Sequence, residues 1–158
     1  MHYEMMFPEQ IREAIDKNTP VAMALGVLEY HGEHLSPGVD TLLVVRALEM
    51  LEKEMPMVIM PPFYYGSGTY AVAAPERNGG VHVDSQVLQQ FARQLFYNLL
   101  RIGFRKIFVF IHHQSENFAN IVGRAASIRD QNLPEARPLW PDAGSTVCRC
   151  RGDKSLFF

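Results

Sequence analysis

Within twelve positions of this chain lie four side chains that we consider as metal ligands: Glu29, His31, His34 and Asp40. The hydrophobic run at 21–28 predicts a buried strand directly before them. Along an extended backbone Glu29 and His31 would point to the same side, and the glycine and proline residues that follow allow the chain to turn back and bring Asp40 toward them. Carboxylate and imidazole groups bind Zn²⁺ and Mn²⁺. The spacing therefore predicts a metal site beyond the carboxyl end of a strand.

The elements that must position these residues alternate between strands and helices. Hydrophobic segments predict strands over 21–28, 57–60 and 106–111. Apolar residues at helical spacing predict helices over 8–18, 41–55, 84–103 and 115–131, with Asp84 as an N-cap and Gly103 as a stop. This alternation predicts a three-layer α/β/α fold with a mostly parallel sheet, whose functional loops all leave the same edge.

The composition restricts the class of partner. With 158 residues, of which 47% are hydrophobic and 20% charged, the chain suits one soluble domain with a real core. A net charge of -2 without a long basic run argues against nucleic acid as the main partner, so we expect a small-molecule substrate. No apolar run is long enough to span a membrane and no signal peptide is recognisable, so the expected location is the cytoplasm.

The pattern E-x-H-G-x-H-L-x-x-x-x-D at 29–40 resembles a motif of the creatininase family, the metal-dependent amidohydrolases that include creatinine amidohydrolase. The resemblance runs from about residue 20 to about residue 131. It includes the segments 61–66, 79–82 and 110–117. It implies a creatininase-like fold and hydrolysis of a non-peptide C–N bond in a small cyclic amide, amidine or formamide, through a metal-bound hydroxide.

The resemblance also implies a ligand set for two divalent ions, zinc or manganese. Carried over by position, Glu29, His31 and Asp40 come from the first motif, with Asp40 between the ions. Glu116 matches a further ligand, and Asp40 and Glu116 are the expected catalytic residues. Relatives carry N-G-H in the third motif, where anchoring on Glu116 aligns their metal-binding histidine with Gln114. An amide oxygen is a weaker ligand than imidazole, so one metal position should be weakened.

A neighbouring histidine could compensate for Gln114. In an extended segment His112 shares a face with Gln114 and Glu116, whereas His113 does not. Either Gln114 or His112 is therefore expected to complete the site, and the alternative is that both histidines simply close a strand. His34 and His112 are the candidates for orienting the ligands.

Three further residues are candidates for substrate binding: Tyr65, Ser67 and His82. Tyr65 and Ser67 lie in an aromatic and polar loop suited to covering a small planar molecule. Core packing of the tyrosine, and a bond from His82 to a loop carbonyl, are the alternatives.

The end of the chain departs from the family pattern. We expect a creatininase-like domain over 1–132 and an irregular or disordered tail over 133–158, in which Cys148 and Cys150 have no structural role. Family members are longer, so the chain resembles a short or C-terminally truncated member, without a counterpart for a distal histidine proposed to move protons. The sheet would keep an exposed edge, and we expect a homo-oligomer.

Three other interpretations stay open. Gln114 favours a catalytically degenerate member that serves as a binding or assembly subunit. A nucleotide-binding α/β domain is opposed by the lack of a glycine-rich phosphate loop after the first strand. The polar residues could also merely solvate the ends of loops.

Overall fold

The computed structural model of the protein describes residues 1–68, 76–113 and 147–150. Its strands are β1 (Val21–Leu25), β2 (Val58–Ile59), β3 (Ile107–Ile111) and β4 (Val147–Cys150). Its helices are the 3₁₀ turn η1 (Tyr3–Met5), α1 (Pro8–Asp16), α2 (Val39–Leu51) and α3 (Ser85–Ile102). No helix in these ranges is long and apolar enough to cross a membrane.

The described strands form one parallel sheet in the order β2-β1-β3-β4. β1 and β3 occupy the centre and pair along their whole length, from Val21 opposite Ile107 to Leu25 opposite Ile111. Both central strands therefore end at the same level, and the loops that follow them start side by side. This confirms the predicted α/β class with a parallel sheet.

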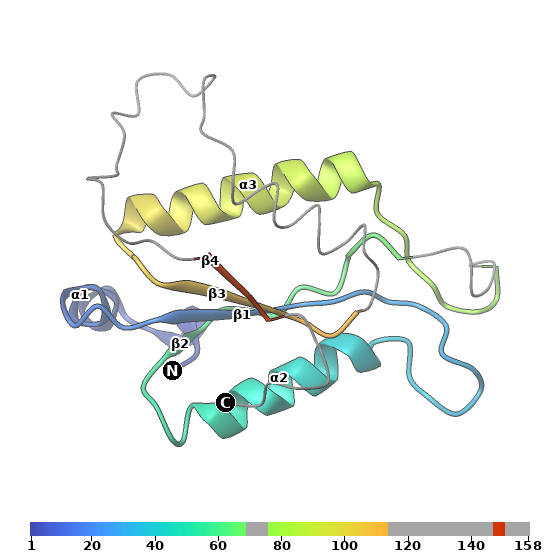
Figure 1. The fold of residues 1–158 in the computed structure, drawn as a ribbon, viewed down its shortest axis with the longest axis horizontal. Helices are drawn as coiled ribbons and strands as arrows, with labels where there is room; N and C mark the ends of the chain where they lie inside the picture. Colours follow the sequence, from blue (N-terminus) through green and yellow to red (C-terminus); the bar gives the residue numbers. More distant parts are fainter. Residues whose placement is uncertain (69–75, 114–146, 151–158) are drawn as a thin grey trace.

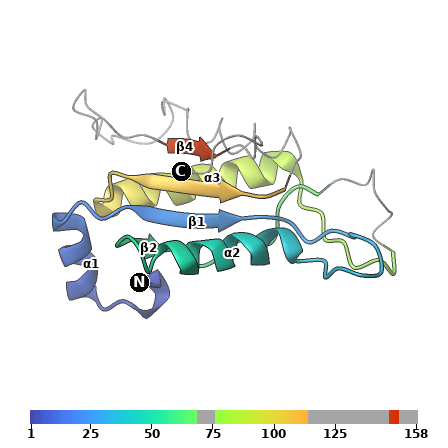
Figure 2. The same ribbon diagram turned by 60° about the horizontal axis from the view of Figure 1, so that its bottom comes forward.

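Helices cover both faces of the sheet, with α2 on one side and α3 on the other (Figures 1 and 2). Alternation along β1 sends Val21, Met23 and Leu25 into the core beneath α3. Ala22 and Ala24 point the other way, into the cluster that contains Val44 and Leu48 of α2. Since every residue of β1 is buried, the strand reads as a continuous apolar run rather than an alternating one.

The predicted helix ends are confirmed most closely at α3. The Asp84 side chain accepts hydrogen bonds from the backbone N–H groups of Gln86 and Val87, and the helix stops at Gly103, whose φ of 123° favours glycine. α2 begins at Val39, earlier than the predicted 41. Its N-cap is Gly38, so no polar capping side chain marks this start in the sequence. The predicted helix at 115–131 lies outside the described residues.

β4 lies in the segment 133–158, for which the sequence predicts an irregular tail. It pairs in parallel with β3, from Val147 opposite Ile107 to Cys150 opposite Phe110, and is the end strand on that side of the described sheet. The four residues of β4 include two cysteines and an arginine and show no clear strand periodicity in the sequence. Their extended conformation therefore depends on pairing with β3. The rest of that segment lies outside the described residues.

The exit of β1 depends on a close approach between a glycine and α2. A Cβ atom built on Gly26 would overlap the Thr41 hydroxyl and lie 3.0 Å from the Thr41 backbone nitrogen. Thr41 is fully buried in the first turns of α2. The absence of a side chain at Gly26 therefore allows the first turns of α2 to pack directly against the end of β1.

Replacing Gly26 with alanine should lower the free energy of unfolding by about 1–3 kcal/mol, because the new methyl group must displace buried backbone. Chemical denaturation of the variant and the parent chain measures this loss. Gly68→Ala is the matched control, because among the described residues the atom nearest to its added Cβ would be Glu29 Oε2 at 3.9 Å. Equal stability of the two variants would contradict the packing argument.

Candidate metal centre

The loop after β1 folds back on itself. The backbone N–H of Glu29 donates to the carbonyl of Pro37 over 3.0 Å, which closes the loop. Gly32, inside it, has a φ of 85°, a conformation that glycine adopts at little cost. The chain then enters α2, so that Asp40 lies in the first helical turn, where the helix dipole favours a carboxylate. The predicted turn-back thus has a structural basis.

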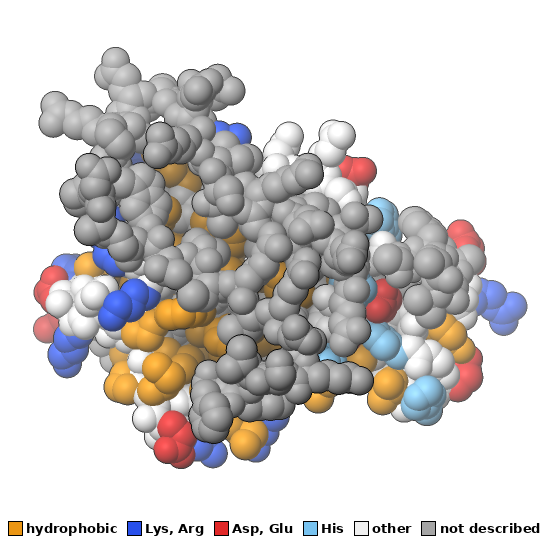
Figure 3. Space-filling view, in the orientation of Figure 1, with side chains coloured by type: hydrophobic (Ala, Val, Ile, Leu, Met, Phe, Trp, Pro, Cys, Tyr) orange, Lys and Arg blue, Asp and Glu red, His pale blue; other side chains and the backbone are white. Residues whose placement is uncertain are grey.

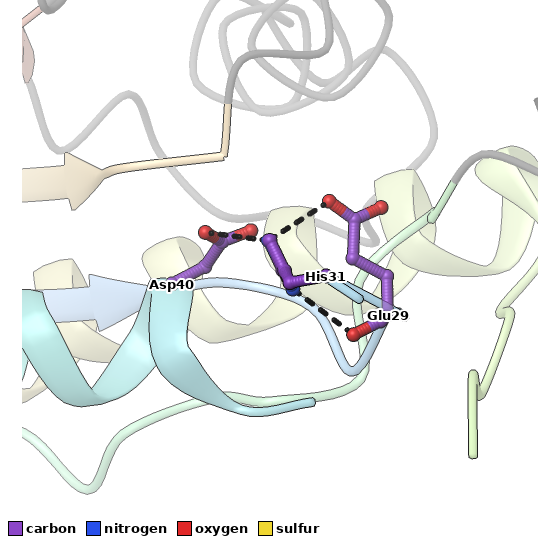
Figure 4. A group of neighbouring side chains, drawn as sticks. All are labelled: Glu29, His31 and Asp40. Atoms are coloured by element: carbon purple, nitrogen blue, oxygen red, sulfur yellow. Dashed lines mark hydrogen bonds and ion pairs between the residues drawn. The ribbon is translucent and has the colours of Figure 1, made fainter. Parts of the chain in front are cut away.

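The loop brings together three side chains that can hold a metal ion: Glu29, His31 and Asp40 (Figure 4). One ligand atom from each lies within 4.8 Å of the other two. His31 Nε2 is 3.5 Å from Glu29 Oε1 and 3.4 Å from Asp40 Oδ1. His31 Nδ1 lies 3.0 Å from the Glu29 carbonyl oxygen, a contact that orients the ring. In the space-filling view, histidine and acidic side chains gather beyond the carboxyl ends of β1 and β3 (Figure 3).

A second histidine reaches this group from the end of β3. His113 Nδ1 lies 3.2 Å from Glu29 Oε1 and 3.2 Å from Asp40 Oδ2. This differs from the expectation that His112, and not His113, would face the site. The ladder of β3 ends at Ile111, so strict alternation no longer governs the direction of these two side chains. His113 is buried, and His112 is exposed.

The four side chains are largely removed from water. The exposed fractions of the side chains are 8% for Asp40, 14% for Glu29, 22% for His31 and 5% for His113. The second carboxylate oxygen of Glu29, Oε2, is buried and has no hydrogen-bond partner among the described residues. Buried carboxylates are costly unless positive charge or hydrogen bonds compensate them. The site therefore has a strong preference for cationic groups.

The pKa values of two groups follow from this arrangement. Burial raises the pKa of Asp40, but the hydrogen bond from His113 and the charges of His31, His113 and His112 outweigh burial and leave the pKa below its ordinary value. Burial lowers the pKa of His113, but the hydrogen bond to Asp40 and the charges of Glu29 and Asp40 outweigh it, so that this pKa is raised. Each partner therefore favours the charged form of the other.

The remaining predicted site residues lie at varying distance from this centre. His34 is exposed, with its ring beside Gly32. Tyr65 is 53% exposed and packs edge-on against Phe63. Ser67 is buried, and its hydroxyl lies 3.1 Å from that of Ser85 at the start of α3. The roles predicted for these side chains stay predictions.

His82 is exposed and Nδ1 lies 2.8 Å from the carbonyl oxygen of Gly68. This is the loop-carbonyl contact that the sequence left open as an alternative to substrate binding. Gln114 and Glu116 lie outside the described residues, so their predicted roles rest on the motif. The residue of this cluster that the sequence did not favour is His113, and its signal in the sequence is its place two positions beyond β3.

A parallel sheet between helices, with carboxylates and histidines converging beyond the ends of its central strands, defines an α/β protein with a candidate metal centre. The profile of the creatininase family, described as creatinine amidohydrolase, matches residues 4–155. The chain therefore belongs to the creatininase family. The matched range extends beyond 20–131 at both ends and includes β4.

Solved structures show the same fold. A creatinine amidohydrolase (creatininase) superposes with a TM-score of 0.71 at 16% identity, over 79% of this chain and 49% of that one. A manganese creatininase gives 0.70 at 17% identity, with the same coverage of 79% and 49%. A candidate creatinine amidohydrolase from Bacteroides fragilis gives 0.62 at 21% identity, over 80% and 51%. This chain thus spans about half the length of these relatives. A search of proteins with curated functions gave no match.

The paired shifts of Asp40 and His113 predict a pH optimum for the stability of the metal-free chain. The contribution of His113 is fully present below its unfolded pKa of about 6.5 and is lost as the pH rises through its raised folded value. The contribution of Asp40 is present above about pH 3.9 and is lost as the pH falls through its lowered value. Denaturation in the presence of a chelator across this range measures both slopes.

His113→Asn should remove the decline in stability on the alkaline side. His34→Asn is the matched control, because it removes an exposed histidine from the same region and should keep the parent profile. An unchanged alkaline slope in His113→Asn would contradict the assignment.

Proposed function

We propose that this protein is a metal-dependent amidohydrolase that cleaves a non-peptide C–N bond in a small cyclic amide, amidine or formamide. The observation that carries the proposal is the convergence of Glu29, His31 and Asp40 in a chain of the creatininase family. Family membership supplies the reaction class, and the three side chains supply a place for its metal.

The donor set fits a divalent ion. Zinc ligands lie 2.0–2.2 Å from the metal, so ligands on one tetrahedron are separated by about 3.3–3.6 Å. His31 Nε2 is 3.5 Å from Glu29 Oε1 and 3.4 Å from Asp40 Oδ1, close to that spacing. The buried Oε2 of Glu29, without a hydrogen-bond partner in the described part of the chain, offers a further donor atom. A dication would also neutralise the two carboxylates.

The chain's own residues then have distinct tasks. Divalent ions supply Lewis-acid polarisation of an amide carbonyl and activation of water. When Nδ1 of His31 donates to the Glu29 carbonyl oxygen 3.0 Å away, Nε2 is left as the acceptor nitrogen that faces the carboxylates. Glu29 and Asp40 hold negative charge where little water reaches, which strengthens their attraction for cations. Glu116 is included as a ligand and catalytic residue on its motif alone.

The relatives support two ions and a small substrate. One matched structure is a mutant creatininase of Zn-Zn type, another is a manganese creatininase, and a third is a mutant creatininase complexed with creatine. We therefore propose two zinc or manganese ions and a substrate of similar size. Tyr65, with half of its side chain exposed, is the proposed wall for such a molecule. We also propose that the chain forms a homo-oligomer, as expected from the sequence.

A second candidate function is a binding or assembly subunit without catalysis. Gln114 favours it, because the amide stands where relatives have a metal-binding histidine. The two candidates differ in metal content and turnover. A chain that binds fewer than two ions and hydrolyses no amide would support the subunit.

Asp40→Ala should reduce the affinity for Zn²⁺ or Mn²⁺ at least about 100-fold, since outer partners of a metal alone contribute 10–100-fold. Elemental mass spectrometry after dialysis against limiting metal measures the bound equivalents. Asp84→Ala is the matched control: it removes another helix-start carboxylate, one that caps α3 and lies outside the metal group. Unchanged metal content in Asp40→Ala would contradict the site.

Turnover tests the reaction class directly. We expect the metal-loaded chain to release product from at least one member of a panel of creatinine, other cyclic amides and formamides, and Glu29→Gln to lose that activity. Two bound equivalents without turnover on any member would favour the binding subunit.

A further inference from the structure

The two oxygens of the Asp40 carboxylate face different histidines. Oδ1 is 3.4 Å from His31 Nε2, and Oδ2 is 3.2 Å from His113 Nδ1. Glu29 Oε1 lies near both rings, 3.5 Å from His31 Nε2 and 3.2 Å from His113 Nδ1. A carboxylate with one imidazole on each oxygen has the arrangement of a bridge between two cation positions.

We propose that His113 supplies, through Nδ1, the imidazole ligand of the second metal position, in place of the residue at 114. This inference rests on the proposed metal-dependent function and deepens it. In this assignment His31 and Asp40 Oδ1 hold one ion, and His113 and Asp40 Oδ2 hold the other. Glu29 Oε1, which lies within 3.5 Å of a nitrogen of each ring, could contribute to either position.

The surroundings of His113 suit a ligand. Its side chain is 5% exposed, and Nδ1 lies 3.2 Å from each carboxylate oxygen, close to the separation of about 3.3–3.6 Å between ligands on one zinc ion. Its ring therefore needs only small adjustment to share a cation with Asp40. An imidazole nitrogen is also a stronger ligand for zinc than the neutral amide of Gln114.

The end of β3 explains how the imidazole ligand can come from position 113 instead of position 114. β3 stops at Ile111, opposite Leu25, so the backbone at 112 and 113 is released from the ladder. His113 turns into the site and His112 stays exposed. The histidine that the family motif expects at 114 is thereby replaced by a ring one residue earlier in the chain.

Two matched variants and a rescue test this assignment. We expect the full-length parent chain to hold two equivalents of Zn²⁺ by elemental mass spectrometry, and His113→Asn to hold one. His112→Asn, the neighbouring exposed histidine, should keep two. Adding Gln114→His to His113→Asn should restore the second equivalent. Circular dichroism verifies that each variant is folded.

The outcomes separate this inference from the proposed function. Two equivalents in both the parent and His113→Asn would overturn the role of His113 and leave the metal centre intact. Loss of an equivalent in His112→Asn but not in His113→Asn would assign the ligand to His112 instead. A parent chain that binds no divalent ion would overturn the proposed function itself, and this inference with it.

A measurement on the unmodified chain covers the case in which His113→Asn does not fold. In ¹⁵N-histidine spectra, addition of Zn²⁺ should move the Nδ1 resonance of His113 as the second equivalent binds, and leave that of His112 in place. Movement at His112 alone would overturn the proposal.

Discussion

Two poorly solvated carboxylates, Glu29 and Asp40, impose the constraint on which this end of the molecule depends. Removing negative charge from water is costly, and the cost is met by whatever cationic group lies within a few ångströms. In the metal-free chain the imidazole rings of His31 and His113 occupy these positions, each within 3.5 Å of a carboxylate oxygen. The same demand for positive charge is what makes the cluster suitable for divalent ions.

The fold meets this demand by placing the carboxylates on elements that cannot easily separate. Glu29 follows the fully buried β1, and Asp40 lies in the first turn of α2, whose position is set by the close approach of Gly26 to Thr41. Small residues on β1, Ala22 and Ala24, face the α2 side of the sheet. The packing of β1 against α2 therefore maintains the distance between the two carboxylates.

Much of this could be predicted from the sequence where local chemistry decides the structure. Asp84 and Gly103 mark the ends of α3 because a cap and a left-handed stop act within one turn. The turn-back from Glu29 to Asp40 was predictable for a similar reason. The choice between His112 and His113 was not, because it depends on where the ladder of β3 stops. β4 escaped prediction because its conformation comes from pairing with β3.

The pairing of β1 with β3 also has a consequence for folding. Val21 to Leu25 match Ile107 to Ile111 across a stretch that contains α2, β2 and α3, so this ladder closes a long loop and must overcome its entropy. The contact between His113 and Glu29 can form only after that closure. The loop at 29–40 can fold early from local turns. The complete cluster of side chains, however, forms only once β1 and β3 have paired. A chain arrested before β3 docks would carry the whole first motif and still lack one wall of the site.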